Sequence, residues 1–220
     1  MSSPAKRGNL QPRINLPPPR LQGKVSLEET ILRRRAVRRY GREPLDLLQL
    51  SQILWSAQGI TGSRGLRAAP SAGATYPLEI FVVVGEQTVT GGEAKQAHQE
   101  LQAGIYHYEA DSHSLSLHKP ADLRPDLARA ALDQEFIIDA PADIVICALY
   151  DRTSDTYGTR GERYVHIEVG HVGENIHLQA VALGLATVEV GAFRDEEVRK
   201  VLGVDEQIKP LYIMPVGKPV

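Results

Sequence analysis

The sequence predicts one globular α+β domain in which helices cover a mixed sheet. The chain has 220 residues, of which 42% are hydrophobic, enough for one core of ordinary size. Helical patterns come first, and patterns of buried strands then alternate with a hairpin and further helices, an order typical of α+β layers. No repeat with a period of roughly 20 to 50 residues recurs. We therefore expect residues 26–220 to form one domain that follows an extended arm, residues 1–25.

The arm is rich in proline. It holds five of the 14 prolines and no hydrophobic period, which favours an extended, partly polyproline segment over packed structure. Its basic residues are not followed by an apolar segment and a cleavage site, so we do not expect a secretion signal. No apolar stretch approaches the ~20 residues of a bilayer-spanning helix. The single cysteine, Cys147, excludes an internal disulfide and favours a reducing compartment. We expect a cytoplasmic protein.

The first packed elements are two helices and a strand. Ser26 and Glu29 have the spacing of a capping box, which predicts a helix from Ser26 to about Arg35. A second helix runs from Asp46 to Ala57 and ends at the cap Gly59. A loop rich in Gly, Ser and Arg, residues 59–73, then leads into a buried strand at 80–84, and such loops are common ligand sites.

The rest of the chain alternates between strands and helices. The long helix contains Gly170 and Gly173, each of which costs about 1 kcal/mol of helix propensity relative to alanine. We expect these glycines to permit close packing against another element. The predicted elements are a hairpin over 104–119, a helix over 123–132, a buried strand over 143–149, the long helix over 160–183, a strand over 186–190, a helix over 195–202 and a last strand over 211–216.

Charge is distributed unevenly along the chain. Residues 1–40 contain ten Lys or Arg and two acids, whereas the remainder contains 15 and 25. Such a basic segment could attract nucleic acid, an anionic membrane surface or a phosphorylated ligand. Arg34 and Arg38 are four residues apart, on one side of a predicted helix end with Arg35 alongside, and could hold a phosphate by bidentate hydrogen bonds. The alternative is a solvated basic face.

Other motifs favour packing over chemistry. Two Glu-x-x-His pairs, Glu168 with His171 and Glu174 with His177, have the spacing of di-metal helical bundles. The pairs face different directions, and no second helix offers matching carboxylates, so we expect no metal site. Cys147 lies in a buried-strand pattern, where a thiol acts as a small hydrophobe. The glycine fingerprint that binds dinucleotides is absent, so a nicotinamide would not be held by that motif.

The arginine segment and several later segments resemble the FMN-dependent nitroreductase superfamily. Residues 34–40, RRAVRRY, are similar to its Arg-Arg-Ser-x-Arg-x-aromatic segment, with Ala36 in place of the serine. The segments RAAPSAGATYPLEIFVVV, RYVHIEVGHVGENIHLQAVALGLATVEVGAF and KPLYIMPVGKP follow in the family's order, and the resemblance covers about residues 26 to 219. It implies a mainly antiparallel central sheet flanked by helices, with the long helix at the centre of a homodimer.

The resemblance also implies a flavin site between two protomers. The arginine segment would bind the FMN phosphate, the Pro70–Gly73 turn would lie against the isoalloxazine ring, and the backbone around Val190 would donate to flavin N5. Lys218 would complete the phosphate site near the chain end. The cofactor-binding residues implied in this way are Arg34, Arg35, Ala36, Arg38, Pro70, Ser71, Ala72, Gly73, Glu189, Val190, Gly191 and Lys218.

The implied activity is that of an FMN-dependent oxidoreductase. It would transfer hydride through flavin N5 from NAD(P)H to a small nitro or quinone-type oxidant, with substrates set by loops such as residues 86–98 and 151–161. Within the superfamily the chain is most similar to the dehydrogenases that oxidise peptide azolines. Their catalytic Lys-Tyr pair falls on Thr156 and Tyr157, so Tyr157 is the candidate catalytic residue, with an ordinary loop tyrosine as the alternative.

Three alternative functions remain open at this point. One is an azoline-type dehydrogenase acting on a modified peptide, and another is a flavin-binding protein without turnover, such as a carrier or sensor. The third is a nucleic-acid binder that uses the arm and the arginines, but it lacks interleaved aromatic residues and its acidic body would repel a phosphate backbone. We therefore expect neither nucleic acid nor a membrane as a partner.

Overall fold

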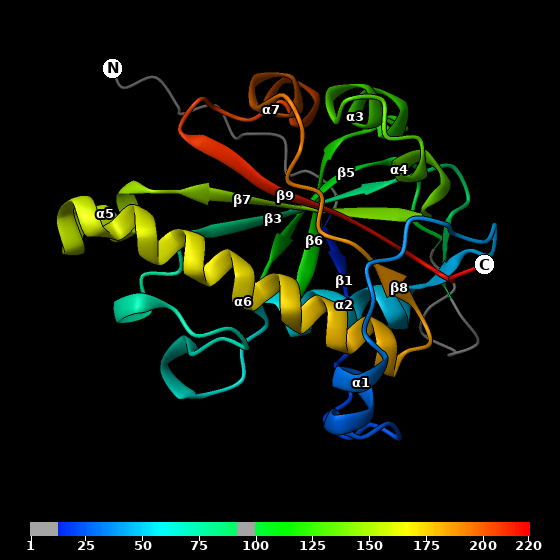
Figure 1. The fold of residues 1–220 in the computed structure, drawn as a ribbon, viewed down its shortest axis with the longest axis horizontal. Coiled ribbons are helices and arrows are strands. Elements are labelled where there is room, and N and C mark those ends of the chain that lie inside the picture. Colours follow the sequence, from blue (N-terminus) through cyan, green and yellow to red (C-terminus); the bar gives the residue numbers. More distant parts are fainter. Residues whose placement is uncertain (1–12, 92–99) are drawn as a thin grey trace, which may run out of the picture.

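The computed structural model describes residues 13–91 and 100–220. Its centre is a seven-stranded sheet in the order β1-β6-β5-β3-β7-β9-β8, and each neighbouring pair in it is antiparallel (Figure 1). In the described ranges, parallel pairing occurs between the short strands β2 and β4 and at the bridge between Ala36 and Thr187. The mainly antiparallel α+β fold is thereby confirmed. The sheet strands are β1 (Arg13–Asn15), β3 (Leu78–Val84), β5 (Gly104–Glu109), β6 (Ser114–Lys119), β7 (Ala142–Leu149), β8 (Ala186–Thr187) and β9 (Ile208–Gly217), beside the pair β2 (Leu45–Asp46) and β4 (Val89–Thr90).

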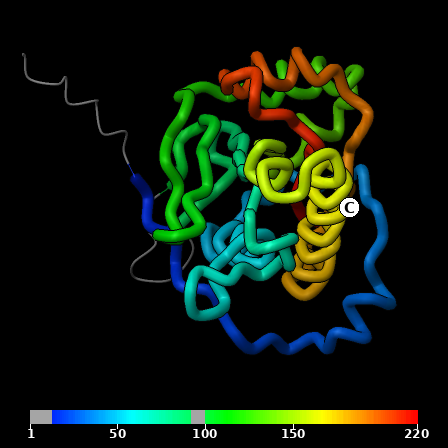
Figure 2. Tube along the Cα trace, turned by 90° about the vertical axis from the view of Figure 1, so that its left-hand side faces the viewer, coloured from blue at the N-terminus to red at the C-terminus, as the bar shows by residue number. Residues whose placement is uncertain are grey.

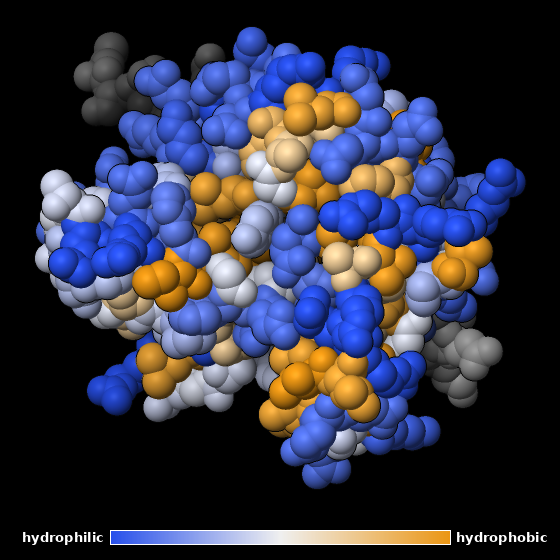
Figure 3. Space-filling model, in the orientation of Figure 1, coloured by the Kyte–Doolittle hydropathy of each residue, from blue (hydrophilic) through white to orange (hydrophobic). Residues whose placement is uncertain are grey.

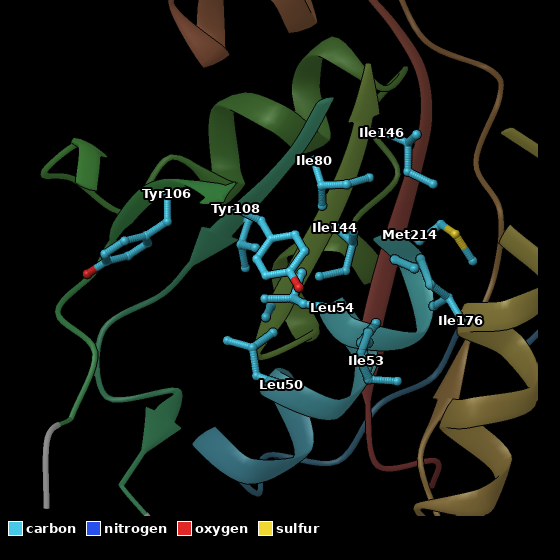
Figure 4. Packing of buried hydrophobic residues seen from close by; sticks show 14 of the residues in the cluster. Leu50, Ile53, Leu54, Ile80, Tyr106, Tyr108, Ile144, Ile146, Ile176 and Met214 are labelled. Carbon is cyan, nitrogen blue, oxygen red and sulfur yellow. The ribbon is translucent and has the colours of Figure 1, made fainter. Parts of the chain in front are cut away.

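Helices bury both faces of this sheet. On one face, Ile80 and Ile144 point toward Ile53 and Leu54 of α2 and Ile176 of α6 (Figure 4). On the other, alternate residues of β3 and β7 pack against α3 and α7. Because both faces are buried, these strands are continuous apolar runs rather than alternating ones. The helices are α1 (Leu27–Arg33), α2 (Leu47–Gln58), α3 (Arg124–Ala130), α4 (Phe136–Asp139), α5 (Asp151–Tyr157), α6 (Gly161–Ala182) and α7 (Asp195–Leu202).

Helix α1 starts where the capping box predicts and ends earlier than expected. The Ser26 hydroxyl accepts the Glu29 N–H at 3.2 Å, and the last helical residue is Arg33. The chain then turns extended, because the Val37 N–H donates to the Thr187 carbonyl at 3.0 Å. The expectation that Arg34 and Arg38 share one side of a helix end is therefore wrong: both lie in an extended segment beside β8.

Helix α2 is capped at both ends by predicted residues. Asp46 accepts the Leu48 N–H at 2.9 Å, and the Gln49 side chain accepts the Asp46 N–H at 3.0 Å. Gly59 ends the helix with φ −64°, which is not the left-handed conformation of a usual glycine cap. Glycine is needed there because a Cβ would overlap the Trp55 ring.

Two segments hold more structure than the sequence predicts. Part of the arm, β1, pairs with the hairpin strand β6, and the following Leu16 is buried. Residues 151–160, expected as a variable loop, form α5 and a 3₁₀ turn. The other expected loop, 86–98, and the start of the arm lie partly outside the described residues. Within 13–91 and 100–220, none of the helices combines the length and apolar character that crossing a bilayer requires.

Candidate functional site

The extended arginine segment lies between two distant parts of the chain. Ala36 pairs with Thr187, and the Gly41 N–H donates to the Lys218 carbonyl at 2.9 Å. The structure therefore brings the predicted phosphate-binding residues of the segment beside β8 and the C-terminal residues. The Arg34 side chain is 35% exposed, whereas Arg35, Ala36, Arg38 and Lys218 are exposed.

Acidic side chains from the second half of α6 and from the segment after β8 face Arg34. Glu174 Oε1 lies 3.7 Å from Arg34 Nε. Glu189 Oε2 lies 2.8 Å from Nε2 of the buried His177. Burial works to raise the pKa of Glu189, but the hydrogen bond and charge of His177, with a smaller contribution from Arg34, outweigh it and lower that pKa. In the second Glu-x-x-His pair, Glu174 thus pairs with Arg34 and His177 hydrogen-bonds Glu189, so the two members have different partners.

The backbone of Glu189–Gly191 runs beside β9. The Val190 N–H donates to the Ile213 carbonyl at 2.8 Å, and the Val190 carbonyl accepts the Ile213 N–H at 3.0 Å. In an antiparallel pair of this kind the neighbouring amides point to the opposite side. The Val190 amide is therefore committed to the sheet, and the Gly191 amide is directed away from β9.

The Pro70–Gly73 turn packs against the residue that was singled out as catalytic. Gly73 has φ +60°, and a Cβ on it would lie 2.6 Å from the Tyr157 hydroxyl. Tyr157 also meets Tyr164 edge to face, with ring centroids 5.1 Å apart. Tyr157 is the last residue of α5, so it is fixed by a helix and not carried by a loop. The structure brings Tyr157 and the turn together.

These two groups of predicted residues lie along different parts of α6. The turn and Tyr157 are near its beginning, whereas the arginine segment, Glu189 and Lys218 lie alongside its second half (Figure 1). The 22 residues of α6 extend over ~33 Å. Figure 2 shows the described part of the arm and α1, in blue, passing below α2 and the end of α6. A cavity of about 960 Å³, lined by residues of the arm, α1, α2 and the second half of α6, includes Lys218 but no residue of the turn. One chain therefore holds the predicted site as two separate parts.

A third group of polar side chains, not foreseen from the sequence, supports the residues after the turn. Arg152 Nη1 donates to the Tyr76 carbonyl at 3.1 Å and pairs with Glu79, which also bonds His107. Burial opposes charge on His107, but its hydrogen bonds to Glu79 and Glu109 outweigh this and raise its pKa. These residues come from β3, β5 and α5, and no local pattern in the sequence connects them.

Two buried groups stand apart from both parts of the site. Cys147 is fully buried in β7, and burial raises the pKa of its thiol, as expected for a small hydrophobe. Asp143, at the start of the same strand, is also fully buried, and neither of its oxygens has a hydrogen-bond partner within the described residues. Burial raises the pKa of Asp143 well above its ordinary value.

Comparison with known proteins establishes the family. The model of the nitroreductase family matches residues 31–218, and the chain belongs to this family. It is 46% identical over 194 residues to a protein of Methanocaldococcus jannaschii named as a nitroreductase, covering 88% of this chain and 91% of that one. The resemblance predicted from the arginine segment and the later motifs is thereby confirmed.

A solved structure and a more distant relative agree with this assignment. The crystal structure of a protein of Ralstonia eutropha, described as a nitroreductase, superposes with a TM-score of 0.80 at 27% identity and covers 97% of this chain and 92% of its own. The microcin B17-processing protein of Escherichia coli is 27% identical over 157 residues, which are 69% of this chain and 54% of that protein. The chain thus spans about half of this peptide-processing relative.

Proposed function

We propose that the protein is an FMN-dependent oxidoreductase that acts as a homodimer and carries hydride from NAD(P)H to a small nitro or quinone-type oxidant. Family membership supports oxidoreductase chemistry. The observation that carries the proposal is the meeting of the arginine segment with Thr187 and Lys218, two parts of the chain that are far away in sequence. Two of these arginines also have local contacts: Arg35 donates to the Leu32 and Arg34 carbonyls, and Arg38 lies over the Phe136 ring, 6.0 Å from its centroid.

The residues present fit FMN in charge and in shape. Guanidinium groups are suited to bidentate contacts with a phosphate dianion. Arg34 meets Glu174 only at a loose 3.7 Å, and the nearby Glu189 is already hydrogen-bonded to His177. At the turn, Ala72 has a small side chain and Gly73 has none, so a flat ring could approach the backbone closely on the side that Tyr157 leaves open. Gly73 has a positive φ, which glycine adopts at little cost and a larger residue adopts only with strain.

Each part of the site then has a role toward the cofactor. FMN, when bound, supplies hydride transfer at N5. Arg34, Arg35 and Arg38 would neutralise its phosphate, with Lys218 beside them. The Gly191 amide, which β9 does not use, is the backbone donor that would face the ring, and a preorganised donor of this kind stabilises negative charge as it develops. Tyr157 and the turn would cover the other side.

A second copy of the chain would join the two parts. If two α6 helices pack antiparallel, the beginning of one lies beside the second half of the other, so the turn of each copy meets the arginine segment of its partner. Gly170 supports such packing, because no atom of residues 13–91 or 100–220 lies within 4 Å of where its Cβ would be. A glycine inside a helix costs about 1 kcal/mol relative to alanine. Gly173 faces Glu189 within the chain and needs no partner.

Exposed apolar side chains on α1 also support the homodimer. Leu27, Ile31 and Leu32 are 61%, 56% and 72% exposed, and they form an apolar patch over α1 on the face drawn in Figure 3. A helix of seven residues that buries only Thr30 against its own chain has little to hold it in place unless another surface covers it.

The test is reconstitution with FMN. The purified chain is incubated with FMN and passed through gel filtration coupled to light scattering. We expect flavin absorbance to co-elute with a mass of two chains, at one flavin per chain. Anaerobic titration with NADH and NADPH then identifies the reductant by bleaching of the flavin. Protein that retains no flavin would refute the proposal, and bound flavin that neither nucleotide reduces would indicate a carrier or sensor, or an enzyme reduced by its own substrate.

An azoline-type peptide dehydrogenase is the second candidate. The likeness to the microcin B17-processing protein and the place of Tyr157 against the turn favour it. Thr156 stands where that subgroup has lysine, so the basic partner for proton abstraction is absent. Thr156→Lys in the FMN-loaded protein, assayed on an azoline-containing peptide, tests this candidate. Azole formation would support it, and a continued lack of product would argue against it.

A further inference from the structure

The Pro70–Gly73 turn is followed by backbone that two ordinary residues adopt at a cost. Gly73, Ala74 and Tyr76 have φ of 60°, 52° and 45°. The left-handed region is open to glycine but costs other residues roughly 1–2 kcal/mol each. Such a conformation persists only where surrounding contacts hold it. Ala74 and Tyr76 therefore need an anchor, and the turn that we assign to the flavin ring depends on it.

The anchor includes two hydrogen bonds that close the turn. The Tyr76 N–H donates to Ser71 Oγ at 3.0 Å, and Thr75 Oγ1 donates to the Ala72 carbonyl at 3.0 Å. The Ser71 side chain also lies close enough to Glu168 to lower the pKa of that acid. The Ser71 hydroxyl thus accepts from the strained residue and lies beside an acid on α6, so it stands between the turn and that helix.

Glu168 is buried beneath the turn and is tied to it by a second route. Only 3% of Glu168 is exposed, and Gln58 is 1% exposed. Gln58 Nε2 lies 3.5 Å from Glu168 Oε1, and Gln58 Oε1 accepts from Arg67 Nη1 at 3.1 Å. The Arg67 guanidinium lies over the Tyr76 ring, 4.6 Å from its centroid, and the backbone N–H of Arg67 donates to the Tyr76 hydroxyl at 3.2 Å.

Both routes therefore run from Glu168 to Tyr76, one through Ser71 and one through Gln58 and Arg67. An acid on the inner face of α6 is costly, and burial raises the pKa of Glu168 against the opposing effects of Ser71, Gln58 and Arg67. A hydrophobic residue would fill the same place among Val165, Val169 and Val172. The packing of α6 alone does not explain the carboxyl group.

We infer that Glu168 is a positioning residue that holds the Pro70–Gly73 turn in its strained form through Ser71 and through Gln58 and Arg67. It does not touch the reacting atoms. Its role in catalysis rests on the proposed function, whereas its hold on the turn is a property of the chain itself. The two can be measured separately.

The first measurement uses the chain without FMN. Amide hydrogen exchange of the peptide that spans residues 70–76 is compared in wild type, Glu168→Leu, Glu168→Gln and Ser71→Ala. In Glu168→Leu the side chain keeps its bulk but loses its hydrogen-bond acceptor. We therefore expect the amides of residues 70–76 to exchange about tenfold faster, a factor that corresponds to about 1.4 kcal/mol. Ser71→Ala, which leaves α6 intact, should do the same, and Glu168→Gln, which keeps an acceptor oxygen, should remain close to wild type.

Val172→Ala is the matched control, because Val172 is fully buried on the same helix and has no part in the network. It should lower the melting temperature without selective exchange at the turn. Unchanged exchange in both Glu168→Leu and Ser71→Ala, or equal acceleration in Val172→Ala, would overturn the inference. If Glu168→Leu does not fold, Ser71→Ala and Glu168→Gln decide it.

The second measurement connects the turn to the cofactor. The FMN dissociation constant should rise about tenfold in Glu168→Leu and Ser71→Ala, and it should stay near the wild-type value in Glu168→Gln and Val172→Ala. If the wild type binds no FMN, the proposed function fails while the exchange result still decides the role of Glu168. If the turn loosens without any change in FMN affinity, the positioning role is refuted.

Discussion

Arg33 and Arg34 are adjacent in sequence but differ in what they contact, and this difference gives a sharp test of the phosphate site. Arg33 lies in the last turn of α1 and pairs with Glu29 at 2.7 Å. Arg34 lies after the helix, in the segment that pairs with β8, and its nearest acid is 3.7 Å away. We predict that Arg34→Ala weakens FMN binding strongly and that Arg33→Ala leaves it almost unchanged.

The magnitudes follow from these contacts. A hydrogen bond to a charged group contributes about 1.5–3 kcal/mol, so loss of the Arg34 contact to phosphate should raise the FMN dissociation constant about 10- to 100-fold. The Arg33 pair is an exposed i,i+4 pair worth about 0.5 kcal/mol to α1. Loss of the loose contact between Arg34 and Glu174 should lower the free energy of unfolding by an amount about as small as loss of the Arg33 pair.

The assay is quenching of FMN fluorescence by each variant at two ionic strengths, with melting temperatures measured alongside. Both variants should melt within a few degrees of wild type. If Arg33→Ala and Arg34→Ala weaken FMN binding equally, the effect is diffuse attraction by a basic surface and the reasoning is refuted. Equal affinities of all three proteins would show that the phosphate binds elsewhere.

Three further predictions concern the ring, a buried acid and a half-buried histidine. Gly191→Pro, which removes the outward amide, should shift the bound flavin potential to a more negative value, while Gly191→Ala, whose Cβ would lie 3.6 Å from Tyr212, should not. Burial raises the pKa of Asp143 in the folded chain. The free energy of unfolding should therefore fall as pH rises above the unfolded pKa of Asp143, by up to about 1.4 kcal/mol per pH unit. Urea unfolding of Asp143→Asn should lack this pH dependence. The pKa of His107 is raised by Glu79 and Glu109 against the effect of burial. Its stabilisation is therefore full below its unfolded pKa of about 6.5 and lost as pH rises through the folded value, and His107→Gln should be destabilised at low pH and less so at high pH.

Local signals predicted the elements whose ends are fixed by neighbouring residues. The Ser26 cap starts α1, the Asp46 cap starts α2, and α7 occupies the predicted residues 195–202. Continuous apolar runs located β3 and β7, because both faces of the sheet are covered. These features need contacts only a few residues apart, which sequence patterns contain.

The missed features depend on long-range pairing. The extended form of residues 34–38 follows from hydrogen bonding to Thr187, and the strand β1 from pairing with β6. No pattern near either segment contains that information. The Glu168 network was also missed, because the Glu-x-x-His spacing drew attention to metal binding. A better signal was available, since Glu168 lies within the apolar stripe of Val165, Val169 and Val172.

The candidate site shows the same division. Sequence motifs selected the arginines, the turn and the segment after β8, but whether these meet in one chain or between two is a question of geometry. Two predicted parts of a flavin site along one helix are the arrangement that the proposed dimeric site requires. Equilibrium titration of the wild-type chain with FMN, followed by analytical ultracentrifugation at the flavin wavelength, tests this directly. We predict saturation at one FMN per chain and flavin sedimenting with a dimer, and flavin that stays free, or that sediments with a monomer, would contradict it.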